Sequence, residues 1–330
     1  MTEPTPPAAA PDTLDQAHRL AESLRQEIGK ALIGQEAVVE QVLVALFAAG
    51  HVLIEGVPGL GKTLLVRALA RTFDGRFARI QFTPDLMPAD VTGHVIYDLQ
   101  AESFTLRKGP VFTHLLLADE INRAPAKTQS ALLEVMQEGQ VTLEGRAMPV
   151  PRPFMTLATQ NPLEQEGTYP LPEAQLDRFL FKIRIDYPAV EEETALVAHV
   201  TGSQVGEQLD VSAVRQQIDP QGIVTLQRIA ARLQVDRAVN DYAVAIVRAT
   251  RDWQGISVGA GPRGGIALIR AARAAALLDG RDFVAPDDIK RVALPALRHR
   301  IVLTPELELE GHHPDQVLAA VLDHVEPPRQ

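Results

Sequence analysis

Short apolar runs alternate with amphipathic stretches through the first half of the chain. The amphipathic stretches predict helices at residues 14–32, 36–49 and 62–73. The apolar runs predict five β-strands, at residues 52–54, 78–82, 115–118, 154–159 and 179–185. Because these runs are continuously apolar, they are typical of strands buried on both faces. The pattern therefore predicts an α/β sandwich around a largely parallel five-stranded sheet.

The strand pattern fades beyond Pro188. Helical periodicity replaces it, at residues 191–201, 223–233, 237–253, 265–278 and 287–297. This shift predicts a boundary between an α/β domain, residues 14–188, and an α-helical domain, residues 189–330. The first dozen residues hold four prolines and no apolar periodicity. They predict a disordered tail over residues 1–13.

A glycine-rich loop lies between the first predicted strand and the helix that follows it. Glycines let consecutive backbone N–H groups curl around phosphate oxygens, and the helix N-terminus attracts the same anion. We expect Lys62 to reach the β- and γ-phosphates of ATP, and Thr63 to offer its hydroxyl to Mg²⁺. The loop thus predicts a Mg²⁺-dependent ATPase. It fits G-x-x-x-x-G-K-T and comprises Gly56, Val57, Pro58, Gly59, Leu60, Gly61, Lys62 and Thr63.

Two acidic residues, Asp119 and Glu120, follow the apolar run at residues 115–118. In a parallel α/β sheet, ligands bind beyond the carboxyl ends of the strands. We expect Asp119 to hold Mg²⁺ beside the glycine loop, and Glu120 to orient and deprotonate an attacking water. Two acids could instead simply precede a helix. The glycine loop upstream favours the catalytic interpretation.

Three further polar residues fit either a functional or a structural role. Asn161 ends another apolar run, where it could bind the γ-phosphate or the lytic water, or be a turn residue before proline. Arg178 precedes the fifth predicted strand, and Arg263 stands at the predicted start of a helix. Either arginine could stabilise charge on the leaving phosphate or pair with a neighbouring aspartate at the surface. Residue chemistry leaves these alternatives open.

Composition excludes several classes of protein. The chain has no cysteine, which excludes disulfides, thiolate catalysis and Cys-ligated zinc. The net charge of −10 argues against nucleic acid as the main partner, because binding to phosphates requires a basic face. No apolar run is long enough to cross a bilayer, and the start lacks the order of a secretory signal. We expect a cytoplasmic protein without membrane insertion.

With these residues in place, the chain resembles the MoxR family of AAA+ ATPases over about residues 14–310. Residues 56–63 match the Walker A motif of the family, and residues 115–120 match Walker B with Glu120 as its catalytic glutamate. Two longer segments resemble hallmarks of the family, residues 82–93 and 171–179. The resemblance implies the AAA+ sandwich followed by a helical lid domain.

The resemblance also assigns roles to residues that chemistry alone left open. Asn161 falls at the sensor-1 position, and Ile33 and Gly34 match a segment near the adenine. Arg178 falls at the arginine finger, which acts on the ATP of a neighbouring subunit, and Arg263 at the sensor-2 arginine. A finger that acts in trans implies a closed homo-oligomeric ring, a hexamer in this family.

The family carries two inserted elements in this core. They would lie here at about residues 91–108, as a helix-2 insert, and 138–153, as a hairpin before sensor 1. Residues 139–145 independently predict a short strand and turn. In relatives such loops face the central pore of a ring. Plain solvent-facing connections fit equally well, since no aromatic pair for gripping a substrate is obvious.

The resemblance implies an ATPase that remodels or matures a client protein complex, including metal-cofactor insertion, alongside a partner with a von Willebrand factor A domain. A related alternative is the motor subunit of a metal chelatase, which the segment at residues 82–93 disfavours. A nucleotide-gated binding module with little turnover is a third hypothesis, and Glu120, Asn161 and Arg178 argue against it. A DNA motor is disfavoured by the net charge.

Overall fold

A five-stranded parallel sheet forms the centre of the computed structural model, which describes residues 10–57, 59–98, 102–161, 167–203 and 210–328. The strand order is β2-β5-β8-β1-β9, which confirms the predicted parallel sheet. Each strand lies within two residues of its predicted position. The strands are β1 (Val52–Glu55), β2 (Phe77–Gln81), β5 (Leu115–Asp119), β8 (Met155–Gln160) and β9 (Phe181–Arg184).

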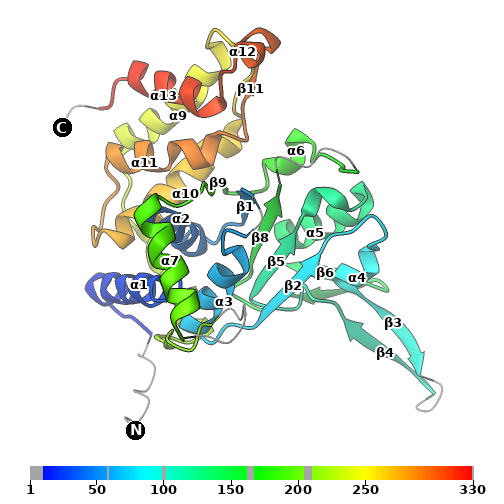
Figure 1. The fold of residues 1–330 in the computed structure, drawn as a ribbon. Coiled ribbons are helices and arrows are strands. Elements are labelled where there is room, and N and C mark those ends of the chain that lie inside the picture. The colour runs from blue at the N-terminus through cyan, green and yellow to red at the C-terminus, as the bar shows by residue number, and fades with distance from the viewer. Residues whose placement is uncertain (1–9, 58, 99–101, 162–166, 204–209, 329–330) are drawn as a thin grey trace.

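Helices cover both faces of the sheet (Figure 1). In β1, Val52 and Ile54 point to one face and Leu53 to the other, as the strand period of two requires. The first face is covered by α1 (Leu14–Gly29), α2 (Glu36–Phe47) and α3 (Lys62–Thr72), and the second by α4 (Pro88–Thr92) and α5 (Ala126–Glu138). Residues 1–9 of the expected tail and Pro58 of the glycine loop lie outside the described residues.

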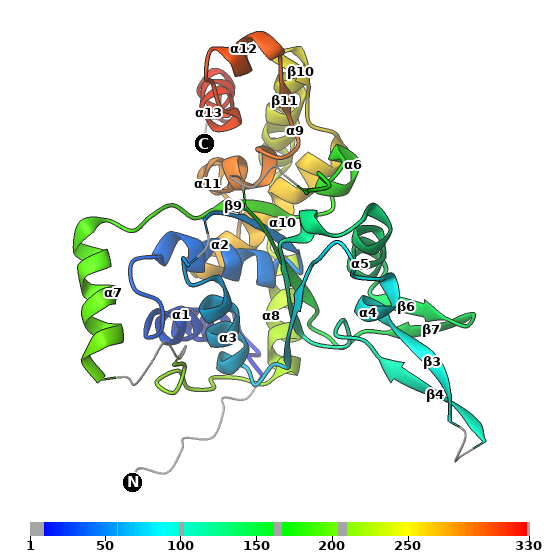
Figure 2. The same ribbon diagram turned by 45° about the vertical axis from the view of Figure 1, so that its right-hand side comes forward.

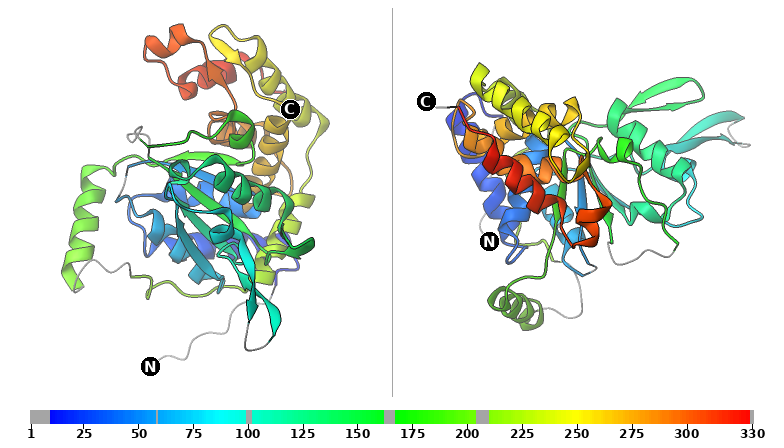
Figure 3. Two further views of the ribbon diagram at one scale, coloured as in Figure 1. Left: turned by 90° about the vertical axis from the view of Figure 1, so that its right-hand side faces the viewer. Right: turned by 90° about the horizontal axis from the view of Figure 1, so that it is seen from above.

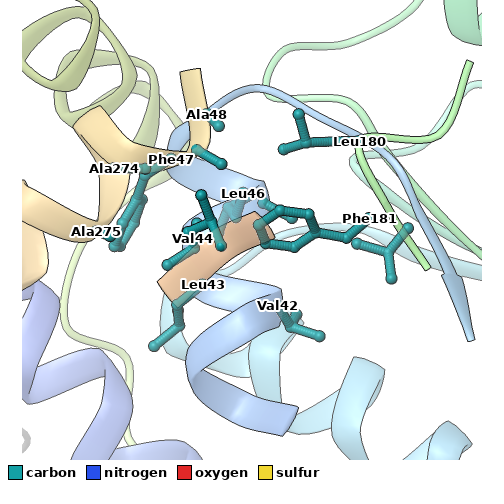
Figure 4. Packing of buried hydrophobic residues seen from close by; sticks show 14 of the residues in the cluster. Val42, Leu43, Val44, Leu46, Phe47, Ala48, Leu180, Phe181, Ala274 and Ala275 are labelled. Atoms are coloured by element: carbon teal, nitrogen blue, oxygen red, sulfur yellow. The ribbon is translucent and has the colours of Figure 1, made fainter. Parts of the chain in front are cut away.

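α2 is buried on every side over its second half. Every residue from position 42 to position 47 is buried. Figure 4 shows this part of α2 between Phe181 of β9 and the small residues Ala274 and Ala275. Both alanines belong to α10 (Pro262–Leu278), and their small side chains let this helix approach α2 closely. A helix that is apolar all round is stable only when other elements enclose it.

The C-terminal half of the chain is helical, with one short antiparallel pair of strands. Gln227 Nε2 donates to the carbonyl oxygen of Leu46 at 2.8 Å, and Arg270 Nη2 to that of Ala48 at 2.6 Å. Side chains on both sides of Pro188 thus share one core, and the proposed boundary there stays a prediction. The helices are α7 (Val190–Ser203), α8 (Pro220–Arg232), α9 (Arg237–Asp252), α10 (Pro262–Leu278), α11 (Pro286–Leu297), α12 (Pro305–Leu309) and α13 (Pro314–His324), and the strands β10 (Ile256–Val258) and β11 (Val302–Leu303).

α7 stands apart from the other helices, at the left of Figure 2.

None of the helices in the described part of the chain is both long and apolar enough to cross a membrane.

Two antiparallel hairpins extend from the sheet, and both are visible from above in Figure 3. The first occupies the region expected to hold the helix-2 insert, and the second includes the strand and turn predicted at residues 139–145. On the first hairpin Ile96 is 43% exposed and Tyr97 is 50% exposed, on opposite faces of the strand, which the sequence pattern did not reveal. The hairpins are β3 (Gly93–Asp98) with β4 (Ser103–Lys108), and β6 (Gln140–Leu143) with β7 (Arg146–Pro149).

His51, just before β1, is a buried polar link between the layers. Its Nδ1 accepts a hydrogen bond from the Thr156 backbone N–H at 3.0 Å, so the neutral ring carries its proton on Nε2. Nε2 donates to the carbonyl oxygen of Met136 at 3.0 Å. Burial lowers the pKa of His51 to about 4, although the bond to Met136 opposes this shift. The folded protein therefore holds His51 neutral.

Lowering the pH from about 7.5 to about 5 is expected to reduce the free energy of unfolding by about 2 kcal/mol through His51. The unfolded chain binds this proton near pH 6.5, whereas the folded chain binds it near pH 4. The stabilisation that His51 provides is therefore complete above the pKa of the unfolded chain, about 6.5. It is lost as the pH falls toward the pKa of the folded chain, about 4. Urea unfolding of the native protein and of His51→Gln at both pH values measures it. Identical pH dependence of the two proteins would contradict the prediction.

Candidate functional site

The glycine-rich loop joins the carboxyl end of β1 to the N-terminus of α3. Gly59 (φ 88°) and Gly61 (φ 73°) have left-handed backbones that residues with a Cβ rarely adopt. Gly56 is needed for space, because a Cβ there would lie 2.7 Å from the carbonyl oxygen of Ile185. α3 begins at Lys62, so the free N–H groups of its first turn lie beside the loop. This backbone shape suits an anion at a helix N-terminus.

Lys62 lies inside the curve of this loop. Its Nζ donates a hydrogen bond to the carbonyl oxygen of Gly56. Burial lowers the pKa of Lys62, and the carboxylates of Asp119 and Glu120 oppose that shift. The ammonium group therefore interacts with the two acids at the end of β5, although they are distant in sequence.

Asp119 ends β5 with its carboxylate held by two neighbours. Arg79 Nε on β2 lies 2.7 Å from Asp119 Oδ2, and the Thr159 hydroxyl on β8 donates to Oδ1 at 3.0 Å. The same hydroxyl accepts the backbone N–H of Glu120 at 2.9 Å. Thr159 thus connects both acids to β8, the strand between β5 and β1.

Glu120 has a left-handed backbone, with φ 54° and ψ 51°, directly before the 3₁₀ turn η1 (Ile121–Arg123). A residue with a Cβ in this region costs about 1–3 kcal/mol, and such strain clusters at functional sites. Gln81 Nε2 donates to Glu120 Oε2 at 2.6 Å, and Arg123 Nε lies 3.3 Å from the same oxygen. The strained turn and these two contacts fix where the carboxylate points.

The glycine loop and the two acids enclose one cavity of about 310 Å³. Asn161, which follows β8 and is 8% exposed, also contributes to its wall. The cavity therefore brings together most of the residues that the sequence predicted for the phosphates and the metal. Its lining residues are Gly56, Gly59, Gly61, Lys62, Thr63, Leu64, Arg79, Gln81, Asp119, Glu120, Thr159 and Asn161.

The residues predicted near the adenine lie beside the loop. Gln35 Nε2 donates to the carbonyl oxygen of Leu60 at 2.9 Å, which ties the segment of Ile33 and Gly34 to the glycine loop. Val57 faces a second cavity of about 510 Å³ that continues past Gly56. The loop thus has space on the side away from the acids as well.

Arg178 and Arg263 line a different cavity, of about 400 Å³, which they share with Asp177. Arg178 follows the short helix α6 (Glu173–Leu176), and its Nη1 donates to the carbonyl oxygen of Leu133 at 2.8 Å. Arg263, at the start of α10, lies with Nη1 3.6 Å from Asp177 Oδ2. Neither arginine is among the described residues that line the glycine-loop cavity.

Comparison with known proteins identifies the family. A model of the "ATPase family associated with various cellular activities (AAA)" matches residues 51–181, and a model of the AAA lid domain matches residues 248–321. "Chaperone MoxR1" of Mycobacterium tuberculosis is 45% identical over an alignment that covers 98% of this chain and 86% of that protein. The chain belongs to the MoxR family of AAA+ ATPases. It binds nucleotide and is an ATPase.

Other relatives of this MoxR-family chain match it along nearly all of its length. "Uncharacterized protein YeaC" of Bacillus subtilis is 45% identical over 316 residues, which cover 96% of this chain and 97% of that protein. A crystal structure from Cytophaga hutchinsonii, provisionally described as an ATPase, superposes with a TM-score of 0.88 at 40% identity. That match covers 96% of this chain and 97% of the other. The AAA+ fold, including the lid, is therefore common to them.

The sequence patterns of this MoxR-family ATPase did not single out Arg79, Gln81 or Thr159. Arg79 and Gln81 occupy alternate positions of β2 and contact Asp119 and Glu120. The available signal was a polar side chain at the carboxyl end of a strand, as at Gln81 and Thr159. It becomes informative only once the sheet order makes β2 and β8 the neighbours of β5.

Proposed function

We propose that this MoxR-family ATPase hydrolyses Mg²⁺-ATP in the cavity at the glycine loop. The observation that carries the proposal is that Lys62, Asp119 and Glu120, from two separate elements, line one cavity with that loop. The backbone N–H groups of the loop bind the phosphates, and Lys62 neutralises the β- and γ-phosphates. The nucleoside extends past Val57 toward the segment of Ile33 and Gly34.

The donor set of this cavity fits a Mg²⁺ ion. Mg²⁺ is usually held by one or two carboxylates, with substrate phosphates and water completing its shell. Asp119 would supply the carboxylate and Thr63 the hydroxyl, and both line the cavity. When bound, the ion neutralises charge that develops on the β- and γ-phosphate oxygens. Asp119 is held for this role by Arg79 and Thr159.

Glu120 is the residue that we assign to activation of the attacking water. Its carboxylate accepts the proton as the water attacks the γ-phosphate. Asn161 lies on the same wall of the cavity, and its side-chain amide would orient the water or the γ-phosphate. Gln81 restrains the carboxylate of Glu120 through the 2.6 Å hydrogen bond.

We infer that Arg178 and Arg263 act on the nucleotide of a neighbouring subunit. Both lie on a cavity other than the one that holds their own glycine loop. A cation that approaches the γ-phosphate from a second subunit stabilises the transition state and makes turnover depend on assembly. The functional unit is then a closed ring of identical subunits, which we propose to be a hexamer.

Mixed rings test whether Arg178 acts in trans. Arg178→Ala and Lys62→Ala rings are each expected to lose about 10³-fold in ATPase rate. A mixture should exceed both parents, because an Arg178→Ala subunit keeps an intact glycine loop that a Lys62→Ala neighbour can complete. A mixture of Lys62→Ala with Glu120→Gln is the matched control and should show no gain, since both changes affect the same side of the interface. Absence of recovery in the first mixture would contradict an action in trans.

We infer that the ring uses this turnover to remodel a client protein complex, as in its maturation or metal-cofactor insertion, together with a partner that carries a von Willebrand factor A domain. The word chaperone in the name of the Mycobacterium tuberculosis relative supports such a role. The exposed Ile96 and Tyr97, on opposite faces of the β3–β4 hairpin, offer apolar contacts for a protein chain on either face. A pull-down with Glu120→Gln and ATP, compared with Lys62→Ala, tests for the client.

A further inference from the structure

Arg300, just after α11, is buried against the segment that carries Arg178. Its Nε donates to Asp177 Oδ1 at 2.7 Å, and its side chain is only 3% exposed. Its Nη2 donates to the carbonyl oxygens of Asp177 at 3.1 Å and Phe179 at 2.7 Å, and its Nη1 to that of Leu180 at 3.1 Å. All three nitrogens are thus engaged by protein groups. Nη1 also donates to the carbonyl oxygen of Ala296, so all five N–H groups of Arg300 are engaged and none is free for a nucleotide.

The two preceding residues contact the same segment. Burial keeps the pKa of His299 well below its ordinary value, so its ring is neutral. His299 Nε2 lies 3.0 Å from the carbonyl oxygen of Phe179, which can only accept. Arg298 Nη1 donates to the carbonyl oxygen of Lys182 at 3.1 Å. Three consecutive residues therefore hold the backbone of residues 177–182 against α11.

Asp177 directly precedes Arg178, and its carboxylate contacts two arginines of the helical lid. Its Oδ1 binds Arg300, and its Oδ2 faces Arg263 Nη1 at 3.6 Å. Arg178 is the next residue in the chain. The Asp177 carboxylate therefore links Arg300 to Arg263, and the backbone of the same residue leads directly into Arg178.

Burying an arginine between two elements costs free energy, because its charged guanidinium group loses water. Taking a guanidinium out of water is favourable only with several well-oriented acceptors, and apolar residues of similar volume usually stabilise a fold as well. What arginine adds is a rigid planar fork that fixes the direction of several acceptors at once. The contacts of Arg300 use that fork on the carbonyl groups on either side of Arg178.

We propose that Arg300 is a positioning residue of the site shared between subunits. It fixes Asp177 and the backbone around Arg178, and through them it presents Arg178 and Arg263 together to the nucleotide of the next subunit. This inference rests on the proposed action of these two arginines in trans.

Two variants test this role: Arg300→Lys, which keeps the charge and loses the fork, and Asp177→Asn, which keeps the shape and loses the shared charge. In each homomeric ring kcat for ATP hydrolysis is expected to fall about 10–100-fold, because a shift of about 1 Å at a catalytic group has effects of that size. The KM for ATP should stay unchanged, since the glycine loop of the same subunit is intact. Arg291→Lys is the matched control. Arg291 lies on α11 itself but pairs with Asp279 and Glu40, and this variant should keep its ATPase rate.

Mixed rings show which side of the interface is affected. Either test variant mixed with Lys62→Ala should exceed both parents, because the Lys62→Ala subunit supplies intact Arg178 and Arg263. Either variant mixed with Arg178→Ala should show no gain, because no subunit then supplies an intact pair. A residue that serves only general stability would not produce this directional pattern.

Recovery with Arg178→Ala instead of Lys62→Ala would overturn the inference and assign Arg300 to the glycine loop of its own subunit. Failure of both mixtures, with rings of Asp177→Asn that remain folded and assembled, would equally overturn it. The mixture of Arg178→Ala with Lys62→Ala is the reference. If that reference recovers while Arg300→Lys does not, only the role of Arg300 is wrong; if the reference fails, the shared site itself is wrong.

Discussion

Glu120→Gln is expected to reduce kcat for ATP hydrolysis by about 10²–10⁴-fold while ATP binding persists. The amide has nearly the same shape as the carboxylate but cannot accept the proton of the attacking water. The proposed phosphate contacts come from the glycine loop and Lys62, which line the cavity and which the change leaves in place. Steady-state ATPase rates and equilibrium binding of a fluorescent ATP analogue measure the two quantities separately.

Glu308→Gln is the control for this change. Glu308 is exposed on α12, and the variant removes one negative charge from the surface without touching the cavity. Its turnover should equal that of the native protein. If Glu120→Gln turned over at the native rate, the assignment of the base would be wrong, and a nucleotide-gated module with little dependence on hydrolysis would be favoured.

Lys62→Ala is expected to reduce kcat/KM for ATP by about 10²–10³-fold or more, through weaker binding as well as slower chemistry. The ammonium is the positive charge that the loop itself contributes next to Asp119 and Glu120. Without it, the phosphates would meet two carboxylates with less compensation, so both the ground state and the transition state lose stability. Isothermal titration with ATP and steady-state kinetics detect the two losses.

Lys127→Ala serves as the matched lysine variant. Lys127 is exposed in the first turn of α5 and does not line the glycine-loop cavity. Native ATP affinity and turnover in Lys127→Ala would show that loss of a lysine charge is not in itself damaging. Native turnover in Lys62→Ala would refute the central assignment.

The central sheet could be predicted from local sequence because its strands are buried on both faces. Runs such as the one that becomes β5 are apolar at consecutive positions, and polar residues mark where they end. α13 was not predicted, because the eleven-residue helix has only a short apolar stripe of Val317, Leu318 and Val321. The pairing of β10 with β11 was also not predicted, because the two strands have three and two residues and are far apart in the chain.

Candidate-site residues could be proposed from the sequence where one short segment carries the information. The glycine loop and the pair of Asp119 and Glu120 are such segments, and the structure brings them to one cavity. The contacts of Gln81 with Glu120 depend on the order of strands, which no local pattern encodes. Arg178 and Arg263 are harder still, because their proposed substrate belongs to another subunit, and a single chain offers no partner group by which to recognise them.

The enclosure of α2 restricts how this protein can convert turnover into movement. Phe181 of β9 packs on one side of α2, and Ala274 and Ala275 of α10 on another. A lid that swung about Pro188 would separate these surfaces and expose apolar area at about 25 cal/mol per Å². A motion that keeps these contacts is favoured, in which β9, α2 and α10 of each subunit move together as one nearly rigid body. The proposed ring would then change shape at the interfaces between subunits, where we propose that Arg178 and Arg263 meet the nucleotide.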